Sequence, residues 1–112
     1  MKIVQVEKTK ISETPHKVDV RKLYDHENAQ ANHIILQPGE ALKPHITPVD
    51  VFFYILEGTP DVRIGDETVR VEKDSLVESP KDIVHNLLNN SKETARILVV
   101  KAPKPKGKTR VL

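Results

Sequence analysis

Residues 39–58 read GEALKPHITPVDVFFYILEG, and this stretch decides the fold. Its second half contains Val51-Phe52-Phe53-Tyr54-Ile55-Leu56, a continuous apolar run rich in β-branched and aromatic residues. A short run of this kind, bounded by turn residues, is typical of a strand buried on both faces. The chain has two phenylalanines and two tyrosines, and three of them lie in this run. We therefore expect the hydrophobic core to be centred on it.

Alternating apolar and polar residues predict further strands on both sides of this run. Two alternating segments flank the turn Gly65-Asp66-Glu67, which is a hairpin signal. The predicted strands are residues 18–20, 32–36, 51–56, 62–64, 69–71, 76–77, 84–88 and 95–100. No segment has a long amphipathic helical pattern, so the sequence predicts an all-β sandwich or barrel.

Two spaced motifs lie between residues 39 and 89. The first consists of Gly39, His45, Thr47, Val51 and Gly58, and the second of Asp74, Pro80, Asp82, His85 and Asn89. Their spacing resembles the two signature motifs of the cupin superfamily, which read Gly, His, His, Glu, Gly and Gly, Pro, Gly, His, Asn. The resemblance implies a small jelly-roll barrel, also called a double-stranded β-helix. Asp74 and Asp82 stand at glycine positions, and Asp is one of the few other residues that tolerates a positive φ there.

The resemblance also implies that His45 and His85 match two metal-ligand histidines of the family. Thr47 stands where the family has its other histidine. Val51, or Phe52 if the spacing is read one residue longer, stands where it has a glutamate. Two imidazoles without a carboxylate favour late transition metals over Mn²⁺ or Mg²⁺. We therefore expect at most one weakly held divalent ion (Zn, Ni, Cu or Fe), and Asp50 could restore the charge only if a bulge turned it inward.

The expected ligand pocket lies on the inner face of the barrel. Its predicted residues are Asn32, His45, Thr47, Val51, Phe53, His85 and Asn89. Other roles stay open: the two histidines could be ordinary barrel residues, Asn32 a satisfied rim residue, and Phe53 part of the core. The remaining histidines, His16, His26 and His33, are expected at the surface or an interface, with His33 facing away from the pocket. The sequence assigns no catalytic residue.

Length and composition bound the remaining possibilities. A chain of 112 residues fits one domain, which we place at residues 1–100, followed by a basic Pro/Lys-rich tail at 101–112 that we expect to be extended. The net charge of +2 argues against a nucleic-acid partner, and the lack of cysteine excludes disulfides and thiolate chemistry. No apolar stretch approaches the ~18 residues of a spanning helix, and no signal-peptide pattern is present. A cytoplasmic protein without a membrane partner is expected.

Three functions are compatible with these features. The first is a barrel that binds a small molecule and is metal-free or weakly metallated. The second, suggested by the resemblance, is a metal-dependent oxygenase, isomerase or decarboxylase with an atypical two-histidine site. The third is an interaction module that works through the basic tail. A homodimer is expected because single-domain cupins commonly dimerise and because apolar Ile35 should face outward, and Ile3–Val6 could add a strand to the partner.

Overall fold

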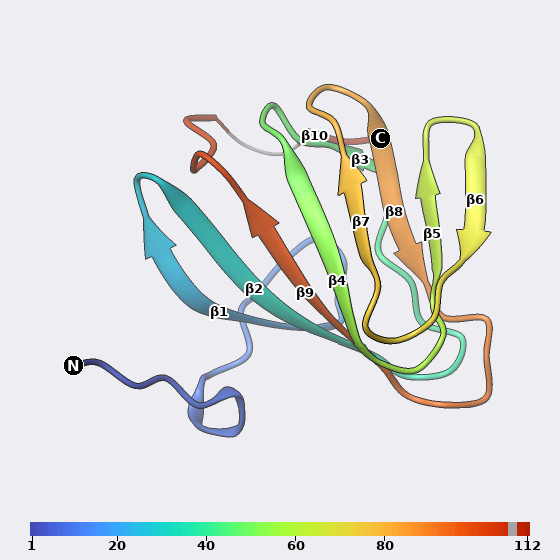
Figure 1. Ribbon diagram of the computed structural model, residues 1–112, viewed down its shortest axis with the longest axis horizontal. Coiled ribbons are helices and arrows are strands. Elements are labelled where there is room, and N and C mark those ends of the chain that lie inside the picture. The colour runs from blue at the N-terminus through green and yellow to red at the C-terminus, as the bar shows by residue number, and fades with distance from the viewer. Residues whose placement is uncertain (108–109) are drawn as a thin grey trace.

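The computed structural model describes residues 1–107 and 110–112. Its strands are β1 (Asp19–His26), β2 (Ala29–Leu36), β3 (His45–Ile46), β4 (Val51–Glu57), β5 (Asp61–Ile64), β6 (Glu67–Arg70), β7 (Leu76–Ser79), β8 (Val84–Leu88), β9 (Ala95–Lys101) and β10 (Arg110–Val111). One 3₁₀ turn, η1 (Val6–Lys8), precedes them. The strands form two five-stranded antiparallel sheets, ordered β1-β2-β9-β4-β7 and β10-β3-β8-β5-β6, which face each other as a double-stranded β-helix (Figure 1). The expected all-β jelly-roll barrel is confirmed.

Strand β4 organises the core, as its composition predicts. It lies between β9 and β7, and its inward residues Val51, Phe53 and Ile55 are buried. Its outward residues Phe52 and Tyr54 are only half-buried, so the expected burial on both faces is complete on one face alone. The inward residues pack with those of the other strands, which places a single core between the two sheets.

The turns take the backbone conformations that the two motifs require. Asp74 and Asp82 both have φ of 64°, which confirms the expectation of left-handed turn residues at these positions. Gly39 and Gly58, the two glycines of the first motif, have φ of 88° and 80°. The motifs therefore fix the turns that bring the strands into register.

The segment before β1 leaves the barrel with Ile3 exposed, and residues 3–6 form no strand within this chain (Figure 1). The expectation that they add a strand to a partner's sheet stays a prediction. The C-terminal segment differs from its expected extended course. Part of the supposed tail returns to the barrel. Lys101 ends β9, Lys104 pairs with Asp25 at 2.9 Å, and β10 pairs with β3, opposite His45 and Ile46. Strand pairing and an ion pair thus order much of a segment whose composition alone suggests an extended chain.

No helix within residues 1–107 or 110–112 has the length and apolar character needed to cross a membrane.

Candidate functional site

A cavity of about 320 Å³ opens at one end of the barrel, between the two sheets. Its apolar wall comes mainly from Val20, Ile34, Val51, Phe53 and Val99. Its polar residues are Thr14, His16, Asn32, His45, His85 and Lys101. A mostly apolar cavity with a few convergent polar groups is the usual form of a small-molecule site.

His45 and His85 meet because β3 and β8 pair antiparallel with these two residues directly opposite each other. Their Nε2 atoms are 3.1 Å apart, and both side chains are buried. His45 Nδ1 lies 2.7 Å from the Lys43 carbonyl oxygen, which can only accept, so Nδ1 carries the proton and Nε2 is the acceptor. His85 Nε2–H therefore donates to His45.

The other ring nitrogen of His85 can be assigned in the same way. Its Nδ1 is left as an acceptor and lies 2.6 Å from Ser79 Oγ, which donates to it. Thr47 Oγ1 lies 3.2 Å from His85 Nε2 on the same side as His45. Ser79, His85, His45 and the Lys43 carbonyl thus form one directional chain of hydrogen bonds in which both imidazoles are neutral.

Burial keeps these histidines neutral at physiological pH. Desolvation, followed by the proximity of His45 and Lys101, lowers the pKa of His85 to about 3. Desolvation also lowers the pKa of His45, partly offset by its hydrogen bond to the Lys43 carbonyl. The polar end of the cavity therefore offers uncharged hydrogen-bonding groups rather than imidazolium cations.

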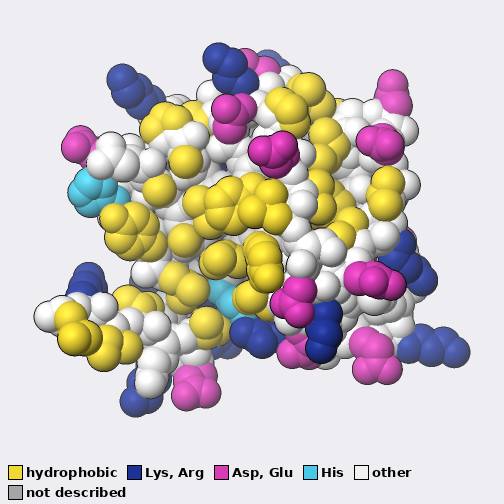
Figure 2. Space-filling view, in the orientation of Figure 1, with side chains coloured by type: hydrophobic (Ala, Val, Ile, Leu, Met, Phe, Trp, Pro, Cys, Tyr) yellow, Lys and Arg dark blue, Asp and Glu magenta, His cyan; other side chains and the backbone are white. Residues whose placement is uncertain are grey.

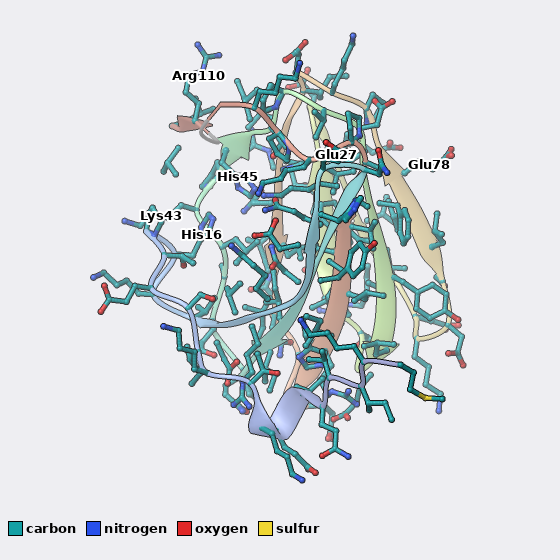
Figure 3. All side chains as sticks on the ribbon, turned by 90° about the vertical axis from the view of Figure 1, so that its left-hand side faces the viewer. His16, Glu27, Lys43, His45, Glu78 and Arg110 are labelled. Carbon is teal, nitrogen blue, oxygen red and sulfur yellow. The ribbon has the colours of Figure 1, made fainter. Side chains whose placement is uncertain are left out.

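His16, which the sequence places at the surface or an interface, is half-buried and lines this cavity, a role that the sequence does not predict. Its ring centroid is 4.8 Å from that of His45, and Figure 3 shows both residues together with Lys43 at one edge of the barrel. Its Nδ1 accepts a 2.9 Å hydrogen bond from the Lys43 backbone N–H, so the neutral ring carries its proton on Nε2. Desolvation, with smaller effects of His45 and Lys101, lowers its pKa to about 4. His16 comes from an irregular loop, where no pattern in the sequence indicates a direction.

Lys101 and Val111 also line the cavity, although the sequence places both in the tail. Lys101 follows Ala95, Ile97 and Val99 on the inner face of β9, so the period-two alternation of that strand is a signal that indicates its direction. Val111 pairs with His45 across β10 and β3. Nothing in the local sequence of residues 108–112 indicates this pairing.

The seven predicted pocket residues are only partly brought together. Asn32, His45, Val51, Phe53 and His85 line the cavity. Thr47 does not line it but lies within hydrogen-bond distance of His85 Nε2. Asn89 lies away from it: its Nδ2 donates to the Leu36 and Glu93 carbonyls, at 2.8 and 2.7 Å, so it serves the structure of a loop.

The other histidines and Asp50 take structural or surface positions. His26 is exposed, as expected. His33 faces outward, away from the cavity, as its place in the strand predicts, but it is buried and accepts a hydrogen bond from Arg96 Nε at 3.1 Å. The Asp50 carboxylate accepts the Lys81 backbone N–H at 2.9 Å, so it does not supply the missing charge near His45.

The distance between the Nε2 atoms of His45 and His85 suits a metal ion, but few other donor atoms lie nearby. When two nitrogens bind the same ion at about 2.0–2.1 Å and the two bonds are near a right angle, the nitrogens lie about 3 Å apart. The Nε2 atoms of His45 and His85 are separated by this distance. Binding would require His85 to move its proton to Nδ1 and Ser79 to become the acceptor. His16 adds no third nitrogen, because its accepting Nδ1 leaves Nε2 protonated. In the part of the chain that the structure describes, no group of three or more His, Cys, Asp or Glu could hold a metal.

Comparisons with known proteins identify a matching family and several similar proteins. A family model for the Cupin domain matches residues 32–101. The chain is 33% identical over 72 residues to the tetracenomycin polyketide synthase protein TcmJ of Streptomyces glaucescens, which covers 63% of this chain and 48% of TcmJ. It is 31% identical over 88 residues to the uncharacterized protein MJ0764 of Methanocaldococcus jannaschii, covering 78% of this chain and 76% of that protein. The chain thus spans about half the length of TcmJ.

Among solved structures, TT1209 from Thermus thermophilus superimposes with a TM-score of 0.80. It is 29% identical in sequence, and the match covers 94% of this chain and 100% of TT1209. The arrangement of the two sheets is therefore shared over nearly the whole length of both chains.

Proposed function

Since this chain belongs to the cupin domain family, we propose that it binds a small, largely apolar molecule inside its barrel, at a site that needs no metal ion. The observation that supports this proposal most is the closed hydrogen-bond chain through His85 and His45. Both ring nitrogens of each of these histidines have a partner among protein groups, so the pair can be satisfied by the protein itself. The remaining polar residues of the cavity, His16, Asn32 and Lys101, and its apolar wall suit a ligand that supplies apolar surface and a few hydrogen bonds.

The relative TcmJ suggests which compounds to try first. It is named as a polyketide synthase protein, and polyketides combine carbon rings with carbonyl and hydroxyl groups. Such groups suit the neutral donors and acceptors of the cavity, and the rings suit its apolar wall. Aromatic and polyketide-like compounds are therefore the first ligands to screen.

A metal-dependent enzyme is the second candidate, and the 3.1 Å distance between the two Nε2 atoms favours it. His45 and His85 would hold the ion, with the Thr47 hydroxyl nearby as a weak neutral donor. A bound Zn²⁺, Ni²⁺, Cu²⁺ or Fe²⁺ would supply a Lewis acid beside the apolar wall. The lack of a negatively charged ligand among these residues predicts weak retention of the ion.

One experiment separates the two candidates. Thermal-shift and calorimetric screens with the compound panel are run on metal-free protein and again after adding each of the four ions. The first candidate predicts that a compound binds metal-free protein and that Val99→Phe, which adds bulk to the cavity wall, weakens binding about tenfold or more. Val69→Phe, at an exposed position on β6, is the matched control and should leave binding unchanged.

The second candidate predicts a different pattern of results. Near-stoichiometric metal would remain in the purified protein and disappear in a His45→Ala/His85→Ala variant, and compounds would bind only after metal is added. That pattern would overturn the metal-independent proposal. No binding under either condition would overturn both.

A further inference from the structure

Lys101 is the one strongly charged group among the described residues that line the cavity. It lies on the inner face of β9, next to Val99 on that face, and pairs with Gln30 and Val51 on the neighbouring strands. It lines the same cavity as His16, His45 and His85, and its charge contributes to lowering the pKa of all three. The family motifs assign no role to this position.

This ammonium has no counterion within the part of the chain that the structure describes. The ion pairs there involve Lys22 and Lys104 but not Lys101, and the described lining of the cavity contains no Asp or Glu. Desolvation, and secondarily the charge of Lys22, lowers the pKa of Lys101 from its ordinary value. A half-buried charge without a partner is unfavourable unless a bound group of opposite sign offsets the loss of water.

Two further groups are available beside this charge. The His16 ring carries its proton on Nε2, which has no hydrogen-bond partner among the described residues and can donate. Asn32 Oδ1 is buried and has no partner in the same part of the chain, so it can accept a hydrogen bond. A ligand with an anionic group and a hydroxyl would satisfy all three residues.

We propose that the ligand is a small organic acid with an apolar body, and that its carboxylate binds the Lys101 ammonium inside the barrel. The inference rests on the proposed function and names its ligand class. A monovalent carboxylate matches the single cation of the cavity, whereas phosphate is typically held by several basic side chains or a nest of backbone N–H groups. The apolar wall formed by Phe53, Val51 and Ile34 would cover the rest of the molecule.

Pairs of carboxylic acids and their neutral amides test this inference directly. The probes are benzoate, 2-naphthoate and 1-hydroxy-2-naphthoate, each compared by calorimetry with the amide of the same ring. The hydroxyl of the last probe can donate to Asn32 Oδ1. Because a hydrogen bond to a charged group contributes about 1.5–3 kcal/mol, the bound acid should have an affinity about 10- to 150-fold higher than its amide.

Variants at Lys101 identify the source of that preference. Lys101→Met should bring the acid to within about threefold of its amide and leave the affinity of the amide unchanged, because it removes the charge and keeps an apolar stem. Lys101→Arg should keep a preference for the acid. Lys92→Met, in an exposed loop, is the matched control and should behave as wild type. Replacing a desolvated charge by an apolar side chain is commonly tolerated, and a melting curve checks that Lys101→Met is folded.

Each result is decisive. Equal binding of acid and amide to the wild type, or an unchanged preference in Lys101→Met, would overturn the carboxylate inference and leave the proposed function standing. The same holds if only neutral compounds from the wider panel bind. If no compound binds at all, the proposed function and this inference fail together.

Discussion

His85 is held on both sides, by Ser79 at one ring nitrogen and by His45 at the other. A protonated imidazolium has two donors and no acceptor, so protonation would force Ser79 to accept instead of donate and would place a second positive charge beside Lys101. These effects add to the desolvation that lowers the pKa of His85 to about 3. The residue is therefore coupled to stability at acidic pH.

Stability should decrease as the pH falls. Because the folded-state pKa is depressed from 6.5 to about 3, the unfolded chain takes up a proton below about pH 6.5 that the folded protein excludes. The contribution is fully present above that pH and is lost progressively toward about pH 3. One such residue predicts a loss of about 2–3 kcal/mol in the free energy of unfolding between about pH 6.5 and 4.5.

Urea denaturation at several pH values measures this loss. His85→Phe should be less stable than wild type at neutral pH, because it leaves Ser79 and His45 without a partner, but its stability should depend less on pH. His26→Phe, at an exposed histidine on β1, should keep the wild-type pH slope. A slope that is unchanged in His85→Phe would contradict the assignment.

At the residue scale, the sequence predicts site residues where a strand or a motif fixes their direction. His45, His85, Val51 and Phe53 follow from the motif spacing and strand alternation, and they do line the cavity. His16 could not be predicted, because an irregular loop has no period that relates sequence position to direction. Asn89 occupies its expected position in the motif, but its side chain stabilises a loop and does not line the cavity. A motif position can be required for the fold as well as for function.

At the scale of the elements, the turns between strands depend on close backbone contacts. Gly58 has φ of 80°, and an added Cβ would collide with the Thr94 carbonyl oxygen and lie 2.9 Å from Ala95 Cα. Gly39 has φ of 88° but no atom within 4 Å of the same position. Both glycines therefore adopt the left-handed conformation, but only Gly58 is closely packed against another backbone segment.

Alanine substitutions separate the two requirements. Gly39→Ala should destabilise the protein by about 1–2 kcal/mol, the usual cost of the left-handed conformation. Gly58→Ala should cost about 3 kcal/mol or more, because the backbone of residues 94–95 must also move. Chemical denaturation of both variants measures the difference. Equal losses would show that β9 can move away from the turn at little cost.

Most strands could be predicted, including the short β5, β6 and β7, but the two-residue strands could not. Strands β2, β4, β8 and β9 have enough residues for alternation or a continuous apolar run to be recognised. β3 and β10 have two residues each, and they exist because distant segments meet. Their pairing is decided by the whole barrel, which is why no local pattern predicts that Val111 lines the cavity.

At the scale of the whole molecule, the outer face of the sheet β1-β2-β9-β4-β7 is unusually apolar. Figure 2 shows hydrophobic side chains gathered across this sheet. The burial alternation of β4 and β9 puts Phe52, Tyr54, Leu98 and Val100 on its outer face, where Phe52 pairs with Val100 and Tyr54 with Leu98. Leu76, on the neighbouring strand β7, is 52% exposed. A continuous apolar face of this kind commonly marks a protein–protein interface, and we propose that a second copy of the chain covers it.

A single charge on this face should prevent dimerisation. Light scattering during size-exclusion chromatography should give a dimer for the wild type and a monomer for Val100→Glu, because the interface would bury an unpaired carboxylate. Val69→Glu, at an exposed position on β6 of the other sheet, should remain dimeric. A monomeric wild type would contradict the proposal. A variant lacking residues 1–8 that dimerises normally would exclude a role of the N-terminal segment in the partner's sheet.

The position of Lys43 has a consequence for how related sequences vary. Its backbone N–H and carbonyl bind Nδ1 of His16 and Nδ1 of His45, respectively, so one residue orients two of the three histidines without using its side chain. Substitutions there should leave the site intact with almost any amino acid except proline, which lacks the N–H. Relatives that share this cavity can therefore differ freely at position 43, and a search for invariant residues would overlook a residue on which the site depends.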